Sequence, residues 1–371
     1  MRQIILFFLF LSFSLTVFAQ NDTTQVENVE NTNESKSSKV KFSAYLETYY
    51  IYDFNEPQNH ARPDFFYSFN RHNELALNLG LIQADYETEK VRARIAFMAG
   101  TYSNANLAAE EGVLKNINEA YIGTKLSKTK NLWIDAGIFS SHIGFESAIG
   151  KNCPNMTRSI LAENSPYYES GIKISYSSDN EKWFFSGLLL NGWQRIQRVE
   201  GNQTLAFGHQ ITFTPTEKIT FNSSSFIGND YPTAEKKMRY FHDFFMQIDF
   251  SDKFGIIAGF DVGTEQKEKG SSEYNTWYSP ILIAKYNFSD KFSLATRIEH
   301  YNDKEGVIIP KTTQNGFQMT AFSVNFDYTI TENLLWRVEY RTLNSKDDYF
   351  VKNNDLISTN QFLGTALAVS F

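Results

Sequence analysis

The sequence has little cysteine and no excess of positive charge. Its one cysteine, Cys153, cannot form an internal disulfide, so we expect a fold that needs none. Lysine and arginine number 35 against 42 aspartates and glutamates. Nucleic-acid binding needs a concentrated basic face, so this balance argues against a nucleic-acid partner.

Long hydrophobic runs are also scarce, because only one exists, over residues 4–18. It follows the basic Arg2 and ends at the small residue Ala19, which is the layout of a signal peptide. A spanning helix needs roughly 20 apolar residues, which disfavours the alternative of an uncleaved membrane anchor. No cysteine follows the run directly, since Cys153 lies far downstream, and this excludes a lipoprotein signal. We predict a cleaved signal peptide over residues 1–19 and therefore an exported protein.

Residues 20–39 are polar, contain no aromatic residue and have no periodicity. This composition predicts a flexible N-terminal tail on the periplasmic side. A plug that filled a barrel is the alternative, but such a plug would need an apolar core that this stretch lacks.

From Val40 onward, apolar residues alternate with polar ones instead of following helical spacing. Successive strand residues point to opposite faces, so each segment has one apolar and one polar wall. A transmembrane barrel has this pattern, because only its lipid-facing residues must be apolar. The clearest apolar sets are Phe42, Ala44, Leu46, Thr48, Tyr50 and Tyr52; Leu75, Leu77, Leu79 and Leu81; and Val91, Ala93, Ile95, Phe97 and Ala99.

The connections alternate in length along the whole chain. Seven short turns lie at 87–90, 127–131, 177–181, 214–218, 251–253, 289–291 and 329–333. Eight longer connections lie at 53–72, 101–117, 140–168, 191–205, 228–238, 264–276, 302–316 and 344–358. A soluble β-sandwich does not ordinarily repeat this alternation. We predict an all-β fold over residues 40–371: an antiparallel transmembrane β-barrel of about 16 strands, with short periplasmic turns and long extracellular loops.

The last segment alternates Leu363, Thr365, Leu367, Val369 and Phe371 with small residues. A closing strand with a terminal aromatic residue is the feature that barrel-assembly machinery recognises in outer-membrane barrels. We therefore expect Phe371 to act as the barrel-closing signal.

About 16 strands enclose an aqueous lumen, whereas about eight would be filled by side chains. The predicted inward faces carry charges of both signs, which a water-filled pore accommodates. The charged inward positions are Glu74, Arg92, Arg94, Lys125, Asp135, Lys173, Asp243, Asp249, Asp261, Arg297, Glu299, Arg337, Glu339 and Arg341.

The longest loop, residues 140–170, contains the apolar stretch 159–162, which a solvated loop would not use. We expect this loop to enter the lumen and form a constriction; packing on the extracellular rim is the alternative. Facing charges at a narrowing act on passing ions. The predicted constriction residues are the loop's Glu146, Lys151, Arg158, Glu163 and Glu169, opposed by lumen-facing Arg92 and Arg94.

Catalytic and metal-binding patterns are poor. The six histidines are scattered, and Ser141 with His142 is the least unlikely nucleophile and base pair. No cysteine and histidine spacing fits zinc. Acidic loop stretches at 347–348 and 353–355 would suit a rim Ca²⁺, although solvated loop charge explains them more simply. We expect no enzyme activity, no cofactor and no metal.

Two stretches resemble a known family. Thr157-Arg158-Ser159-Ile160, Asn164-Ser165-Pro166-Tyr167-Tyr168 and Ser170-Gly171 are similar to one signature of the OmpL-like β-barrel porin family. Leu189-Leu190-Asn191-Gly192-Trp193-Gln194 resembles a second signature. The resemblance implies an outer-membrane barrel that acts as a porin, and it assigns no site residues.

The expected function is passive diffusion of small hydrophilic solutes or ions. The alternative is a non-transporting structural or adhesion barrel that acts through its extracellular loops, although these loops are of modest length. The expected partners are outer-membrane lipid, barrel-assembly machinery and small polar solutes. A homotrimer is compatible with the sequence, because lipid-facing and subunit-facing residues are both apolar.

Overall fold

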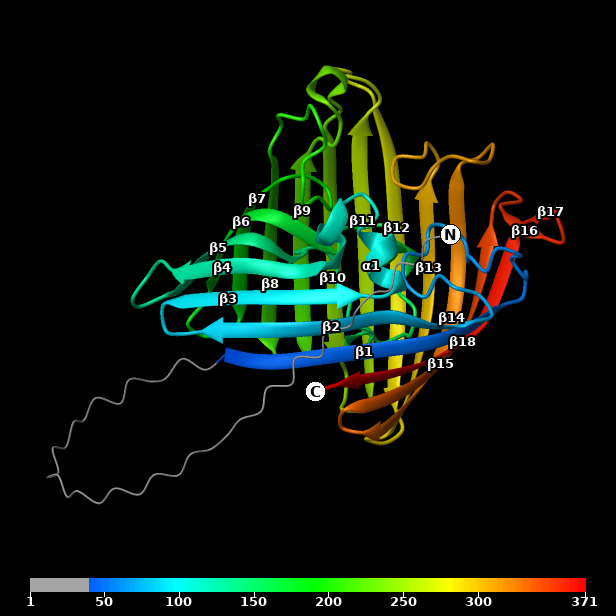
Figure 1. The fold of residues 1–371 in the computed structure, drawn as a ribbon, viewed down its shortest axis with the longest axis horizontal. Coiled ribbons are helices and arrows are strands. Elements are labelled where there is room, and N and C mark those ends of the chain that lie inside the picture. Colours follow the sequence, from blue (N-terminus) through cyan, green and yellow to red (C-terminus); the bar gives the residue numbers. More distant parts are fainter. Residues whose placement is uncertain (1–39) are drawn as a thin grey trace, which may run out of the picture. The chain divides into compact units, whose positions relative to one another are not determined.

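The computed structural model describes residues 40–371, so the predicted signal peptide and tail lie outside the described residues. Sixteen strands close into one antiparallel barrel in which neighbours in the chain are neighbours in the wall (Figure 1). The wall strands are β1 (Val40–Asp53), β2 (Leu75–Glu87), β3 (Val91–Ala99), β4 (Ile117–Lys125), β5 (Asn131–Ser140), β6 (Tyr168–Ser177), β7 (Trp183–Leu190), β8 (Ala206–Thr216), β9 (Ile219–Gly228), β10 (Arg239–Asp249), β11 (Phe254–Gln266), β12 (Tyr274–Asn287), β13 (Phe292–Asp303), β14 (Phe317–Thr331), β15 (Leu334–Ser345) and β18 (Thr359–Ser370).

The predicted strand number and the alternation of short turns and long loops are confirmed. The barrel closes where β18 pairs with both β1 and β15. Phe371 continues this pairing beyond the end of β18: its carbonyl accepts the Ala44 N–H at 2.6 Å, and its N–H donates to the Ala44 carbonyl at 3.0 Å. Its role as a closing signal stays a prediction.

The wall separates apolar from charged side chains. Phe42 and Ile122 point outward and are 77% and 69% exposed, whereas inward-facing Arg297 and Glu299 are buried. An outward apolar surface of this kind is stable against lipid. Among residues 40–371, no helix is both long and apolar enough to span a membrane.

The predicted four-leucine face of β2 is wrong in its second half. The pairing of β1 with β2 shifts register between Glu47 and Thr48, which leaves Asn78 as an extra residue. A bulge of this kind breaks the strict alternation of faces. Leu75 remains outward, but Leu79 and Leu81 turn inward and are 0% and 4% exposed. The Asn78 amide donates to Glu47 at 2.7 Å and accepts the Phe69 N–H at 3.0 Å, which fixes the bulge.

Short elements occupy the long loops. They are α1 (Thr101–Asn106), η1 (Gly112–Asn116), η2 (Gly150–Asn152), α2 (Ile160–Glu163), η3 (Thr233–Glu235) and the hairpin of β16 (Phe350–Lys352) and β17 (Asp355–Ile357). Helix α2 forms from the apolar stretch singled out in the longest loop. Its first turn is capped by Ser159, whose hydroxyl accepts the Ala162 N–H at 3.1 Å.

Candidate functional site

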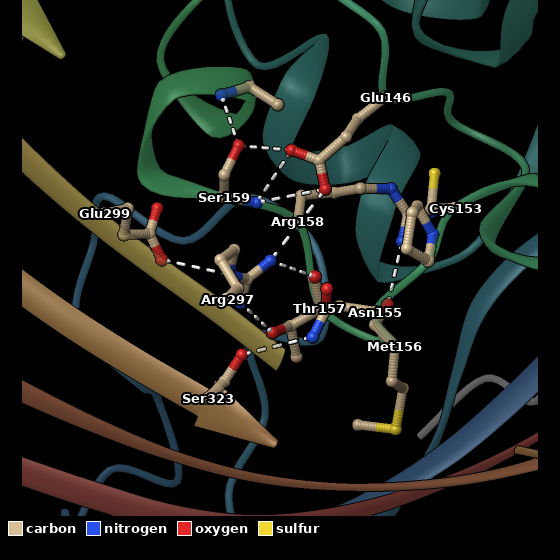
Figure 2. Close-up of polar contacts among 12 residues, drawn as sticks. Glu146, Cys153, Asn155, Met156, Thr157, Arg158, Ser159, Arg297, Glu299 and Ser323 are labelled. Atoms are coloured by element: carbon tan, nitrogen blue, oxygen red, sulfur yellow. Dashed lines mark hydrogen bonds and ion pairs between the residues drawn. The ribbon is translucent and has the colours of Figure 1, made fainter. Parts of the chain in front are cut away.

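The loop between β5 and β6, residues 141–167, lies inside the barrel and is called the lumen loop below. Its backbone contacts inward-facing side chains of β13 and β15. Figure 2 shows the β13 side chains Arg297 and Glu299 beside the loop. Arg297 donates to the Thr157 carbonyl at 2.7 Å, and Arg341 donates to the Arg158 carbonyl at 2.9 Å. The loop therefore reaches the wall strands from the inside, rather than packing on the extracellular rim.

Two arginines and two glutamates hold the middle of the lumen loop. Glu339 accepts the Thr157 N–H at 2.6 Å, and Glu299 accepts the Ile160 N–H at 2.6 Å. The same carboxylates pair with arginines, Glu339 with Arg297 at 3.0 Å and Glu299 with Arg341 at 2.5 Å. All four side chains are buried. Charge-assisted hydrogen bonds of this kind fix the loop backbone in one position.

A separate anchor holds residues 150–154. Arg337 donates to the Gly150 carbonyl at 2.7 Å, the Cys153 carbonyl at 2.8 Å and the Pro154 carbonyl at 3.0 Å. Its charge is balanced by Asp327 at 2.8 Å. One fully buried guanidinium thus donates to three loop carbonyls, and it is the charged donor among their partners, since the Gly150 carbonyl also accepts the Cys153 N–H and the Pro154 carbonyl also accepts the Asn325 amide.

The lumen loop also contains its own buried charges. Arg158 donates to the carbonyls of Ser147 at 2.7 Å and Ala148 at 3.1 Å, which folds the loop back on itself. Glu146 accepts hydrogen bonds from the Ser159 N–H and hydroxyl and lies 3.8 Å from Arg297. Burial raises the pKa of Glu146, although Arg297 opposes the shift.

Glu163 and His142 tie the two ends of the loop to other elements. Glu163 accepts the Tyr67 N–H at 2.8 Å and also bonds Ser68, and burial raises the pKa of Glu163. His142 contacts Glu169 through Nδ1 and the Ser225 carbonyl through Nε2, both at 2.8 Å. The Ser225 carbonyl only accepts, so Nε2 carries a proton, and an ionised Glu169 requires a second proton on Nδ1. Burial alone would lower the pKa of His142, but the charge of Glu169 outweighs it and the pKa is raised.

The remaining predicted constriction residues lie elsewhere. Arg92 pairs with Asp135 at 2.6 Å, and Arg94 pairs with Glu119 at 2.7 Å. Both arginines face the lumen as predicted, but they lie on β3. The lumen loop begins where β5 ends, and β5 is two strands away from β3 in the wall. Lys151 reaches the Ser370 hydroxyl at 2.8 Å. Of the loop carboxylates, Glu146 therefore lies beside Arg297, Glu163 is met by Tyr67 and Ser68, and neither is met by Arg92 or Arg94.

Five wall residues that hold the loop were predicted to face inward, but their contacts with the loop were not predicted. They are Arg297, Glu299, Arg337, Glu339 and Arg341. The available signal was the alternation of opposite charges at every second position, as in residues 337, 339 and 341. Such spacing puts both signs on one face of one strand. A face of this kind can hold a folded loop of the same chain, because the peptide groups of a loop need both hydrogen-bond donors and acceptors.

Two cavities adjoin the lumen loop. The turn-side cavity, of about 480 Å³, is lined by Lys151 and Pro154 of the loop and by wall residues near the short turns, such as Asp252. The loop-side cavity, of about 420 Å³, is lined by Glu163 of the loop and by long-loop residues such as Trp193. A cavity is thus present toward each end of the barrel.

An apolar cluster borders the turn-side cavity and is followed in the chain by a residue that lines the loop-side cavity. Leu161 and Ala162 of α2 pack against Ile281 and Ile283 of β12. Phe145 packs beside them and also lines the turn-side cavity. Helix α2 ends at Glu163, which lines the loop-side cavity. The cluster is the contact through which the lumen loop meets β12.

The described residues show where the candidate metal ligands and the candidate pair Ser141 and His142 lie. Within residues 40–371 there is no group of three or more His, Cys, Asp or Glu side chains arranged to hold a metal ion. The Ser141 hydroxyl accepts the Ile143 N–H at 3.1 Å, while both nitrogens of His142 have other partners. The arrangement needed for a nucleophile and base is therefore not formed in this structure.

The apolar outer wall, the charged lumen and the internal loop define a transmembrane β-barrel of the porin type. The chain belongs to the family described as "Putative beta-barrel porin-2, OmpL-like", whose model matches residues 39–371. It is accordingly a barrel of the outer membrane. A search of curated proteins gave no match.

Solved porins share this fold at low sequence identity. The outer membrane channel DcaP of Acinetobacter baumannii is 11% identical, with a TM-score of 0.60 over 91% of this chain and 99% of that one. The anion-selective porin from Comamonas acidovorans is 8% identical, with a TM-score of 0.59 over 90% and 100%. The trimer form of OmpT of Vibrio cholerae is 8% identical, with a TM-score of 0.58 over 90% and 99%.

Proposed function

We propose that the barrel is a passive diffusion channel for small hydrophilic solutes or ions, and that the lumen loop forms its constriction. The observation that carries this proposal is a loop anchored inside the lumen by buried charges, with a cavity toward each end of the barrel. Diffusion through such a path requires no catalytic group, cofactor or metal.

The seven predicted constriction residues take two roles in this proposal. Glu146, Arg158, Glu163 and Glu169 are buried, so they set the position of the loop rather than touch the solute. Arg92, Arg94 and Lys151 are partly exposed and face the lumen, so they act on ions that pass. Charges that line a narrow aqueous path set ion preference through Coulomb interactions.

The narrowest point, in our proposal, lies beside the buried apolar cluster of Leu161, Ala162, Ile281 and Ile283, which sets how closely the lumen loop approaches β12. Ile283 of this cluster lines the turn-side cavity, and α2 ends at Glu163, which lines the loop-side cavity, so a path that joins the two cavities would run past the cluster. Apolar constrictions resist ions, because water leaves them easily. The channel would then have a modest conductance that depends strongly on the size of these side chains.

The partners of the channel follow from its surface. Outer-membrane lipid covers the outward apolar wall, and barrel-assembly machinery inserts the chain through the closing strand that ends at Phe371. Cleavage of residues 1–19 and a periplasmic tail over residues 20–39 complete the proposed maturation. A homotrimer is supported by the likeness to the trimer form of OmpT.

Planar-bilayer recording of the refolded protein tests the channel. We expect stepwise conductance in symmetric salt. Complete absence of steps at any voltage would exclude a diffusion channel and leave the structural or adhesion barrel as the remaining function. A reversal potential measured in a salt gradient then gives the sign of the ion preference, and Lys151→Gln should shift that potential toward cations.

A further inference from the structure

A second loop packs beside the lumen loop. It comprises residues 61–70, in the connection between β1 and β2, and is called the lid below. The Arg62 N–H donates to the Asn70 carbonyl at 3.0 Å, and Ala61 pairs with Arg71 across the base of the lid. Loops whose ends lie this close together are compact units packed by their own side chains. The lid is therefore a single structural unit.

The lid packs on inward-facing side chains of four wall strands. In the barrel these strands follow one another as β14, β15, β18 and β1. The contacts are Phe65 with Phe317 of β14, Phe66 with Arg341 of β15 and Phe362 of β18, and Phe69 with Tyr49 of β1. All three phenylalanines of the lid are buried. The lid therefore fills the part of the lumen that lies between this sector of the wall and the lumen loop.

One carboxylate joins the lid to the lumen loop. Glu163 accepts the Tyr67 N–H at 2.8 Å and the Ser68 N–H at 3.1 Å, and it also accepts the Ser68 hydroxyl. Asn164 adds a hydrogen bond to the Phe65 carbonyl at 3.3 Å. All three donors to Glu163 belong to the lid, and without this carboxylate they would lose their acceptor. A buried donor left unpaired costs free energy, so Glu163 favours the closed position of the lid.

The closed position also carries unfavourable features. Phe69 has a φ of 51°, in the left-handed region that bulky residues rarely adopt. Its N–H donates to Asn78 at 3.0 Å and its carbonyl accepts from Arg62 at 2.7 Å, so neighbouring contacts hold it there. Burial raises the pKa of Glu163, which shows that its charged form is costly in this position. Opening of the lid would relieve both costs, which offset part of the stabilisation from the buried phenylalanines.

We propose that the lid is a gate at the long-loop end of the channel, and that Glu163 latches this gate closed. The proposal rests on the diffusion channel proposed above and adds its regulation. Tyr67 of the lid and Glu163 both line the loop-side cavity, so a lid that leaves its seat widens that cavity. The position of the lid then controls how readily solutes reach the lumen loop.

Hydrogen exchange of the refolded full-length protein measures lid opening, by mass spectrometry of peptides that cover residues 61–70. Glu163→Met keeps a similar side-chain length but accepts no hydrogen bond. We expect it to accelerate exchange of the lid amides roughly tenfold. Single-channel recording of the same variant should show a higher mean conductance than the wild type.

Two further variants separate the latch from a general loss of packing. Glu163→Gln can still accept the two N–H groups on its amide oxygen while its NH₂ group donates to the Ser68 hydroxyl, so its lid should exchange as slowly as that of the wild type. The matched control is Glu110→Met. Glu110 is likewise buried and accepts the N–H groups of Ile196 and Gln197 and the Tyr168 hydroxyl, none of which belongs to the lid. Its loss should leave lid exchange at the wild-type rate.

Three results would overturn the gate. The first is wild-type lid exchange in Glu163→Met, with circular dichroism showing a folded barrel. The second is equal acceleration by Glu110→Met, which would indicate general loosening. The third is faster lid exchange with an unchanged mean conductance, which would mean that the lid does not control the path. Because hydrogen exchange needs no ion current, absence of conductance in every variant rejects the channel itself, whereas conductance with unchanged lid exchange rejects only the gate.

Discussion

Replacing Arg337 with methionine should release the part of the lumen loop that contains Cys153. Arg337 is fully buried and donates to the Gly150, Cys153 and Pro154 carbonyls while it pairs with Asp327. Methionine is similar in length but cannot donate. The variant therefore loses three loop hydrogen bonds and leaves a buried carboxylate without its partner.

The size of the effect follows from these contacts. Removing one partner of a buried ion pair costs about 3–5 kcal/mol. Part of that cost falls on the barrel wall, and the rest lowers the free energy of loop opening. Each 1.4 kcal/mol changes an equilibrium constant tenfold, so about 2.8 kcal/mol acting on loop opening makes the open loop roughly 100-fold more populated.

Maleimide labelling of Cys153 measures this opening. It is the only cysteine of the chain, its thiol is buried, and burial raises the pKa of Cys153, so the folded protein should react slowly. Arg337→Met should accelerate labelling about as much as the open population increases. The double variant Arg337→Met with Asp327→Asn also removes the carboxylate charge that would be left unpaired. Any acceleration of labelling that remains in this variant is due to the lost hydrogen bonds to the loop carbonyls.

The matched control is Arg71→Met, because the Arg71 side chain is partly exposed and, among residues 40–371, pairs only with Glu74. It should label at the wild-type rate. If Arg337→Met also labels within about threefold of the wild type while circular dichroism shows a folded barrel, Arg337 does not hold the loop, and the reasoning from buried anchors is refuted.

Three further predictions concern other contacts of the barrel. Because the pKa of His142 is raised by Glu169, with Asp243 nearby, its stabilising charge is complete below the ordinary value of 6.5 and is lost as pH rises through the raised pKa. Labelling of Cys153, normalised to the unfolded chain, should therefore accelerate at alkaline pH, and a flat profile would contradict this. Leu161→Ala should raise single-channel conductance, and an unchanged value would place the narrowest point elsewhere. Asn78→Ala should lower the free energy of unfolding by about 1–3 kcal/mol in urea titration, because it leaves two buried partners unpaired; no loss would mean that the bulge needs no side-chain support.

The fold could be predicted from the sequence because a barrel repeats two simple signals. Period-two alternation marks each strand, and the spacing of turns sets the strand number and the end at which each loop lies. The prediction failed at Asn78, since a single extra residue reverses the faces of β2 without disturbing the pattern of leucines. Nothing in the composition of that segment distinguishes Leu77, which is outward, from Leu79, which is inward.

The site was predicted less completely, for a physical reason. An inward-facing charge looks the same in sequence whether it meets water or a folded loop. Arg158 and Glu163 were assigned to the loop correctly, but their burial depends on partners more than 90 residues away, such as Ser68 and Arg341. The hypothesis of an inward-folding loop came from its apolar stretch, because α2 has to bury these side chains. The wall residues that receive it are found only in three dimensions.

Single-channel conductance of a variant that lacks residues 150–163 tests the central claim most directly. This deletion removes the Arg337 anchor, the backbone held by Arg297, Glu299, Glu339 and Arg341, and the apolar cluster with α2. If the lumen loop is the constriction of a diffusion channel, the conductance steps of the variant should be clearly larger than those of the wild type under the same salt. Steps of equal size from a folded variant would contradict the account.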